Sequence, residues 1–211
     1  MRMRRGWSQR VVHDLRNPAS TLRTAAYLLR RGVSDAGEAQ RLLEVIERQS
    51  KQLLAMLDEL ANGFWAERGE RVSRVEPVDL IELAPAPVAG HAEFQPETLL
   101  PVNGDPARLA QLLRLLCALR LGPADAPDPL VGCWEDGRVR LRRRFAALPE
   151  LLEDPEALLH TPLPPLLADD GLGLHLPVAA AIARAHDGRL WIEREDGGVL
   201  AVHVELPAQS P

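Results

Sequence analysis

Three polar residues near the start of the chain have the types and the spacing that phosphoryl chemistry needs. They are His13, Asp14 and Asn17, within the stretch VVHDLRNPASTL from Val11 to Leu22. On a helix, Asn17 lies one turn from His13 on the same face, and Asp14 reaches the edge of the imidazole from the side. An acid that holds one ring proton leaves the other nitrogen nucleophilic, and an amide can hold a water molecule for the reverse, hydrolytic reaction.

The alternative is that His13 is an ordinary solvated histidine on the surface of a coiled coil. A lone histidine on a helix favours that interpretation, but the whole sequence HDLRNP favours a reactive ring, because an acid and an amide accompany it. Pro18 lacks a backbone N–H, so we expect it to bend the helix just after the site and to expose the turn that carries His13.

The elements that carry these residues are predicted from the apolar periodicity. A first helix is expected from about Trp7 to Arg31, and a second follows the break GVSDAGEA, where Ser34 and Asp35 are the capping candidates. The second helix has a heptad seam made of Leu42, Ile46, Gln49, Leu53, Met56 and Leu60. A hairpin of two such helices cannot bury both seams alone, so we expect a homodimer that forms a four-helix bundle.

The rest of the chain predicts a second domain with an α+β fold, in which helices pack on an antiparallel or mixed sheet as an α/β sandwich. Proline and glycine become frequent after AERGE, which indicates a helical unit at 1–66 and a sandwich at 75–208. DPARLAQLLRLLCALRL predicts a helix capped by Asp105, and LPVAAAIARAHDG predicts another that Gly188 ends. Two hairpins are expected in LVGCWEDGRVRLRRRF and RLWIEREDGGVLAVHVELP.

Several stretches together resemble sensor histidine kinases. HDLRNP is similar to the phosphoacceptor box of that family, and the likeness continues through PVDL, GDPARLAQLL, GLGLHL and AHDGRLWIE, over nearly the whole chain. The resemblance implies a dimerisation and phosphoacceptor hairpin followed by an ATPase sandwich of the histidine kinase type. It also implies that His13 takes the phosphoryl group, that Asp14 assists its transfer and that Asn17 supports its hydrolysis.

The nucleotide site departs from that family's pattern at chemically necessary positions. Gly171 and Gly173 are the candidate cofactor-binding residues, but His175 stands where the family has a third glycine, and the alternative is a glycine-rich turn without a ligand. The helix LLRLLCALRLG lacks the family's magnesium-binding asparagine, and RRRFAALPE lacks its Asp-x-Gly-x-Gly box. The segment between Asp79 and Gly104 is also too short for the family's first sandwich helix, and APAPVAG would break a helix.

An intact phosphoacceptor box beside an impaired nucleotide box predicts a phosphorelay protein. In that prediction His13 exchanges a phosphoryl group with an aspartate of a response-regulator receiver domain, and a receiver or a hybrid kinase is the donor. This exchange needs no cofactor, whereas ATP and magnesium are expected only if the nucleotide site functions. Two alternatives stay open: the catalytic core of an active ATP-dependent sensor histidine kinase, and a pseudokinase adaptor that does no phosphoryl chemistry.

Composition excludes other classes of function. A net charge of −5 argues against nucleic-acid binding through bulk electrostatics, and no apolar run has the length of a membrane span, so we expect a cytoplasmic protein. The two cysteines, Cys117 and Cys133, form no CxxC pair and are expected in the core of a protein from a reducing compartment. The histidines have no metal-ligand spacing, so no metal site is expected.

Three further residues or groups have structural interpretations. The run Arg138, Arg140, Arg142, Arg143 and Arg144 is interpreted as the solvated face of an edge strand, with an acidic partner as the alternative. His186 is expected at a helix end, where its charge would favour the last carbonyls. Trp65 and Trp191 are expected to be core or interface anchors.

Overall fold

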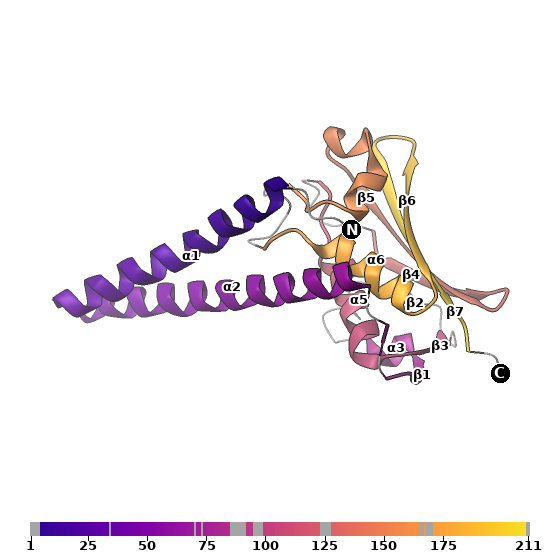
Figure 1. Cartoon of the computed structure of the whole chain (residues 1–211), viewed down its shortest axis with the longest axis horizontal. Coiled ribbons are helices and arrows are strands. Elements are labelled where there is room, and N and C mark those ends of the chain that lie inside the picture. Colours follow the sequence, from indigo (N-terminus) through magenta and orange to yellow (C-terminus); the bar gives the residue numbers. More distant parts are fainter. Residues whose placement is uncertain are drawn as a thin grey trace.

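The computed structural model describes residues 5–33, 35–69, 71–72, 74–84, 92–94, 99–122, 128–164, 167 and 171–209. A long antiparallel helical hairpin is followed by an α/β sandwich, which lies against the end of the hairpin opposite its turn (Figure 1). The predicted fold class is therefore confirmed. None of the described helices is both long and apolar enough to cross a membrane.

The hairpin consists of α1 (Arg5–Arg31) and α2 (Ala36–Arg68), and α1 continues through Pro18 as a single helix. Asp35 caps α2 by accepting hydrogen bonds from the backbone N–H groups of Gly37 and Glu38 at 3.1 Å each, as predicted. Ser34, the other capping candidate, lies outside the described residues. The left-handed conformation of Gly69 ends α2.

The predicted seam of α2 is its inner face. The six residues of that seam are partly or fully buried, and Met56 is only 4 % exposed. A second group of large apolar side chains on α2 is exposed instead: Leu43, Leu54, Leu57 and Phe64. Leu43, Leu57 and Phe64 are separated by multiples of seven residues, so they lie on one side of α2. With Leu54 they form an additional apolar stripe, which the described part of the chain leaves exposed.

The main sheet has five strands in the order β2-β4-β5-β7-β6. It is antiparallel except for the parallel β2 and β4 pair, so it is mixed. Its strands are β2 (Ala92–Phe94), β4 (Leu130–Glu135), β5 (Arg138–Ala146), β6 (Arg189–Glu195) and β7 (Val199–Pro207). A separate antiparallel pair is formed by β1 (Glu76–Asp79) and β3 (Pro101–Gly104). Both predicted hairpins are present, and positive φ angles at Asp136 (51°) and Gly137 (70°) form the first turn.

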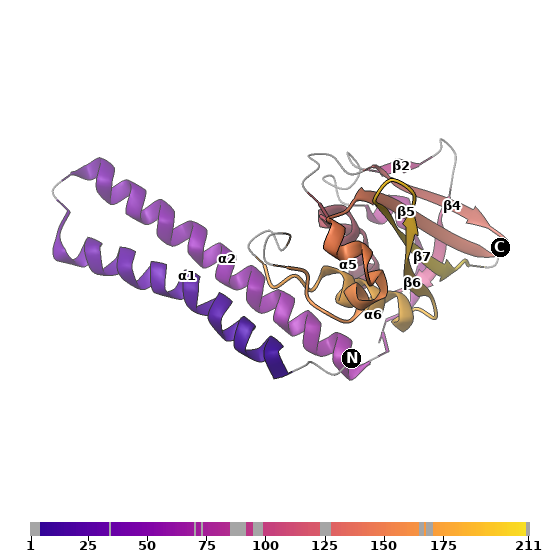
Figure 2. The same cartoon turned by 90° about the horizontal axis from the view of Figure 1, so that it is seen from above.

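Helices α5 and α6 cover the face of the sheet that is turned toward the hairpin (Figure 2). The helical elements of the sandwich are α3 (Leu80–Leu83), α5 (Pro106–Ala118), α6 (His175–Ala185) and two 3-10 helices, η1 (Pro149–Leu152) and η2 (Pro155–Leu159). Asp105 caps α5 as predicted, accepting from the backbone of Ala107 and Arg108. The core is rich in leucine and includes Leu109, Leu112, Leu113 and Leu116.

Between Asp79 and Gly104, the helix found among the described residues is the four-residue α3, and the described strands are β2 and most of β3. Much of this segment, residues 85–91 and 95–98, lies outside the described part of the chain, so the expectation that it is too short for a full helix stays a prediction. Residues 85–90 of the stretch APAPVAG lie outside the described part of the chain.

Two predictions about side chains are wrong, and a third is met only in part. The arginine run lies on β5, which is the central strand of the sheet and not an edge strand. Cys117 is buried as expected, but Cys133 is exposed on β4. Trp65 is a buried anchor, as expected. Trp191 lies on the outer face of the sheet, because β6 alternates its side chains between the core and solvent, so it is not a core residue and its role at an interface stays a prediction.

Candidate phosphoacceptor site

The side chain of His13 faces solvent from the middle of α1. It is 74 % exposed, and its Nδ1 lies 3.1 Å from Oδ1 of Asp14, whose side chain is 21 % exposed. The contact between neighbours on the helix is the sideways approach that the sequence predicts. Because Asp14 engages Nδ1, Nε2 is the nitrogen left to act as a nucleophile.

Arg10 holds the other edge of the same carboxylate. Its Nε lies 3.4 Å from Oδ2 of Asp14, one helical turn away, and its Nη2 donates a hydrogen bond to the carbonyl oxygen of Leu163 at 2.8 Å. Asp14 therefore lies between an imidazole and a guanidinium. Arg10 also connects the helix that carries His13 to the sandwich, a role that no sequence motif indicates.

A cavity of about 220 Å³ lies beside the proposed phosphoacceptor. Its lining includes Asp14, Asn17 and Pro18 from α1, Gln49, Gln52 and Met56 from α2, and Gly171 from the sandwich. The exposed Asn17 thus lines the same cavity as Asp14. The glycine-rich turn of the sandwich approaches the phosphoacceptor box of the same chain.

The glycine-rich turn from Gly171 to Leu174 leads directly into α6. Gly173 has a φ of 76°, and a Cβ atom there would lie 2.8 Å from the backbone nitrogen of Leu163 and 2.9 Å from its carbonyl oxygen. The N–H of Leu163 donates to the carbonyl of Gly173 at 2.9 Å. Glycine is required at position 173 by both conformation and space, whether or not the turn binds a cofactor.

A carboxylate from the hairpin occupies the backbone N–H groups of this turn. The N–H of Leu172 donates to Oε2 of Glu59 at 2.6 Å, and the N–H of Leu174 donates to Oε1 of the same residue. Gly63, one turn further along α2, allows close packing, since a Cβ there would lie 2.8 Å from Cδ1 of Leu174. The donors that a phosphate would use at the start of α6 are bonded to the chain's own carboxylate.

In this arrangement the residues do not fit a nucleoside triphosphate with magnesium. Glu59 fills the anion position of the turn, and α5 has no asparagine to hold a metal ion. His175 also places an imidazole where the resemblance expects a glycine, and its Nδ1 is buried without a hydrogen-bond partner among the described residues.

Arg143 belongs to the stretch RRRFAALPE, which stands where the resemblance expects an Asp-x-Gly-x-Gly box, and its side chain enters the core. It is 1 % exposed, and its guanidinium donates to the carbonyl oxygens of Leu116, Cys117 and Asp128 at 2.8, 2.7 and 2.9 Å. Burial lowers the pKa of Arg143, but an arginine stays charged, so it stabilises the last carbonyls of α5. The alternation of β5 indicates this inward side chain, because Val139, Leu141 and Phe145 share its face.

His186 has the structural role that the sequence predicts, but in a neutral form. Its Nδ1 lies 2.8 Å from the carbonyl oxygen of Ile182, and its Nε2 accepts a hydrogen bond from the N–H of Asp105 at 3.1 Å. A nitrogen that accepts carries no proton, so the ring joins α6 to the start of α5 without the expected positive charge.

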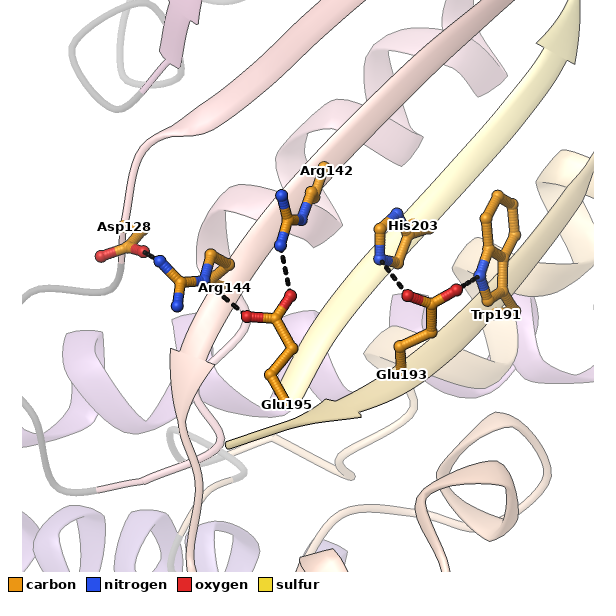
Figure 3. Close-up of polar contacts among 7 residues, drawn as sticks. All are labelled: Asp128, Arg142, Arg144, Trp191, Glu193, Glu195 and His203. Carbon is orange, nitrogen blue, oxygen red and sulfur yellow. Dashed lines mark hydrogen bonds and ion pairs between the residues drawn. The ribbon is translucent and has the colours of Figure 1, made fainter. Parts of the chain in front are cut away.

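Three other arginines of β5, Arg140, Arg142 and Arg144, form ion pairs on the outer face of the sheet, and Figure 3 shows those of Arg142 and Arg144. Arg142 and Arg144 both bind Glu195 of β6, and Arg144 lies 3.4 Å from Asp128. Arg140 binds Glu135 and Glu205. Since these arginines are paired within the chain, they do not form a free basic patch for an acidic partner.

An aromatic pair lies beside this network on the same face of the sheet (Figure 3). The rings of Trp191 and His203 stack with centroids 4.9 Å apart. Glu193 accepts a hydrogen bond from Trp191 Nε1 at 2.8 Å and lies 3.4 Å from Nε2 of His203, an ion-pair distance without hydrogen-bond geometry. Burial lowers the pKa of His203, and Glu193 opposes that shift.

A helical hairpin that exposes a histidine beside an acid, followed by a sandwich with a glycine-rich turn, defines the architecture of two-component signalling proteins. Residues 3–67 match the His Kinase A (phospho-acceptor) domain family. The hairpin of this chain therefore resembles the phospho-acceptor unit of histidine kinases.

The curated relatives are similar over almost all of this chain. It is 26 % identical over 226 residues to the signal transduction histidine-protein kinase BaeS of Escherichia coli (strain K12). This match covers 98 % of this chain and 47 % of BaeS. It is also 26 % identical over 217 residues to the adaptive-response sensory kinase SasA of Synechococcus sp. (strain JA-3-3Ab). This second match covers 93 % of this chain and 57 % of SasA. The chain thus spans about half the length of these relatives.

Solved structures share the fold. The Acinetobacter baumannii histidine kinase AdeS matches with a TM-score of 0.62 and 20 % identity, over 94 % of this chain and 98 % of that one. The histidine kinase ThkA, in complex with the response regulator protein TrrA, matches with a TM-score of 0.65 and 19 % identity, over 96 % of this chain and 61 % of that one.

Proposed function

We propose that this protein is a dimeric phosphorelay component that carries a phosphoryl group on His13 and exchanges it with an aspartate of a response-regulator receiver domain. One contrast carries the proposal. The imidazole of His13 is exposed and oriented by Asp14, whereas the N–H groups of the glycine-rich turn are occupied by Glu59.

The proposed exchange uses Nε2 of His13 as the nucleophile. Nε2 forms a bond to the phosphorus of the receiver's aspartyl phosphate, and the bond between that phosphorus and the aspartate oxygen breaks, so the carboxylate is the leaving group. The ring keeps its proton on Nδ1 and becomes cationic. Asp14, at 3.1 Å from Nδ1, stabilises this charge where it develops. Asn17 is proposed to orient water for hydrolysis of the phosphorylated ring.

Two partners belong to the proposal. A receiver domain is supported by ThkA, a structural relative whose structure is a complex with a response regulator. A second copy of this chain is supported by the exposed stripe Leu43, Leu54, Leu57 and Phe64 on α2, which pairing of hairpins would cover. The proposal assigns dimerisation and phosphoacceptance to residues 1–66 and places the protein in the cytoplasm. The sandwich, residues 75–208, is proposed to need neither ATP nor magnesium for this exchange.

The catalytic core of an ATP-dependent sensor kinase is the second candidate. The sequence match to BaeS over 98 % of this chain favours it, because the match includes the sandwich. Gly171 and Gly173 would then contact nucleotide phosphates, and Glu59 would have to leave the turn. An adaptor without phosphoryl chemistry is less well supported, since it has no need of Asp14 or Asn17.

The source of the phosphoryl group tests these candidates. Purified chain is incubated in parallel with radiolabelled ATP and magnesium, and with a panel of receiver domains labelled by radioactive acetyl phosphate. The phosphorelay predicts acid-labile label from a receiver and none from ATP. The variant His13→Gln should lose the label, and Asp14→Asn should slow its transfer by about 100-fold. Rapid labelling by ATP with none from the receivers would overturn the phosphorelay in favour of the kinase.

A further inference from the structure

The start of α6 is an anion-binding position that the chain fills with its own carboxylate. The N–H groups of Leu172 and Leu174 both point at the carboxylate of Glu59, one to each oxygen atom. Backbone N–H groups at the start of a helix bind anions because they are unpaired within the helix and lie at the positive end of its dipole. Glu59 therefore has the place and the charge of a bound phosphate group.

We propose that Glu59 is a donor-specificity residue that excludes phosphate-bearing small molecules from this turn. It thereby restricts His13 to phosphoryl groups delivered by another protein. This inference rests on the proposed phosphorelay function and explains why a chain with two of the family's glycines would not use a nucleotide donor.

The surroundings of Glu59 hold it in the turn. Gly63 lets Leu174 approach α2, since a Cβ at position 63 would lie 2.8 Å from Leu174 Cδ1. On the other side of the turn, the backbone of Leu163 bonds to Gly173 and receives the hydrogen bond of Arg10. Contacts from both helices of the hairpin thus keep the turn close to α2, which carries Glu59.

A phosphate group and Glu59 cannot share these donors, because each N–H carries one hydrogen and each already has a carboxylate oxygen as its acceptor. Asp58, the neighbour of Glu59, lines the adjoining cavity of about 420 Å³ together with Arg114 and His175. An anion can bind only to those molecules in which Glu59 has moved away from the turn. Its apparent affinity is therefore reduced in proportion to the fraction of such molecules. Displacement would also break the two hydrogen bonds that join Glu59 of α2 to the turn.

The test measures binding of inorganic pyrophosphate to the full chain by calorimetry. Glu59→Gln and Glu59→Ala should each bind it at least about tenfold more tightly than the natural chain, because the competing carboxylate is gone. Asp58→Asn removes the same charge one residue away, at an exposed position of the same cavity, and should change the affinity less than about twofold. Unchanged affinity in both Glu59 variants overturns the inference, and so does an equal gain in Asp58→Asn, which would indicate a general charge effect.

Amide hydrogen exchange gives a second readout that does not depend on any ligand. The N–H groups of Leu172 and Leu174 should exchange at least about tenfold faster in Glu59→Ala than in the natural chain, with the exchange of β7 unchanged. Equal exchange at these two amides would contradict the proposed occupancy. Circular dichroism of each variant verifies that it is folded.

Receiver labelling separates this inference from the function on which it rests. Glu59→Ala should still accept label on His13 from a phosphorylated receiver, because Glu59 does not contact His13. If neither the natural chain nor this variant is labelled by receivers while pyrophosphate binding rises as expected, the phosphorelay is wrong and the exclusion by Glu59 stands.

Discussion

The guanidinium of Arg10 donates a hydrogen bond to the carbonyl oxygen of Leu163 at 2.8 Å, across 153 positions of sequence. The same side chain lies 3.4 Å from Asp14, which in turn contacts His13. On its other side, Leu163 bonds to Gly173. A continuous series of polar contacts therefore runs from the proposed phosphoacceptor to the glycine-rich turn.

Replacing Arg10 with methionine should loosen the segment at Leu163. The loss of one hydrogen bond that contributes about 1 kcal/mol should speed exchange of the Leu163 N–H by about fivefold, because that N–H is protected by its bond to Gly173. The measurement is amide hydrogen exchange followed by NMR. Arg16→Met removes an equal charge at an exposed position of α1 and should leave this amide unchanged. Equal exchange in Arg10→Met and the natural chain would show that the contact does not stabilise the segment.

The exposed stripe of α2 should control the oligomeric state. Leu57 and Phe64 are 45 % and 44 % exposed. The double variant Leu57→Glu and Phe64→Glu should convert a dimer into a monomer, because the two introduced charges would have to be buried in the bundle. Light scattering after gel filtration measures the mass of each variant. Arg48→Glu is the control, because it changes an exposed polar position of the same helix. A natural chain that is already monomeric, or a double variant that stays dimeric, would contradict the assignment.

Arg143 should be necessary for the stability of the sandwich. Arg143→Met leaves the carbonyl oxygens of Leu116, Cys117 and Asp128 without their donor and should lower the free energy of unfolding by about 3 kcal/mol. Urea denaturation measures the change. Arg138→Met, at an exposed position on the same strand, should change it by less than about 0.5 kcal/mol. Similar losses in the two variants would argue that the buried hydrogen bonds add little.

Stability should fall in mild acid because of His203. Burial lowers the pKa of its imidazole in the folded state, despite the opposing charges of Glu193 and Glu195 and together with the repulsion of Arg142. The unfolded state therefore binds the proton more readily, and the free energy of unfolding should decrease as the pH falls through the unfolded-state pKa of about 6.5.

Urea denaturation at about pH 7.5 and about pH 5.5 brackets that pKa. His203→Gln should show a smaller loss between the two conditions than the natural chain, because its side chain takes up no proton. His160→Gln is the control, since His160 is exposed. An unchanged loss in His203→Gln would mean that another group governs the acid sensitivity.

Local sequence alone determined two helix starts, one hairpin turn and the contact between His13 and Asp14 in the candidate site. Asp35 and Asp105 cap helices through N–H groups two and three residues away, and Asp136 with Gly137 forms a two-residue turn. His13 and Asp14 are neighbours on a helix, so their contact needs no distant part of the chain. These features follow from the sequence because every interacting atom lies within one turn of the backbone.

Only the tertiary structure decided what surrounds the site. Glu59 is one of many acids on an amphipathic helix, and nothing near it in the sequence indicates that it binds N–H groups 113 and 115 residues away. Likewise, no sequence motif links Arg10 to Leu163, which lies 153 positions further along the chain. The sequence determined that His13 is displayed beside an acid, because a helix fixes that contact locally. The packing of the sandwich on the hairpin decided that the anion position of the turn is filled from within, because such a contact depends on the relative placement of two separately formed units.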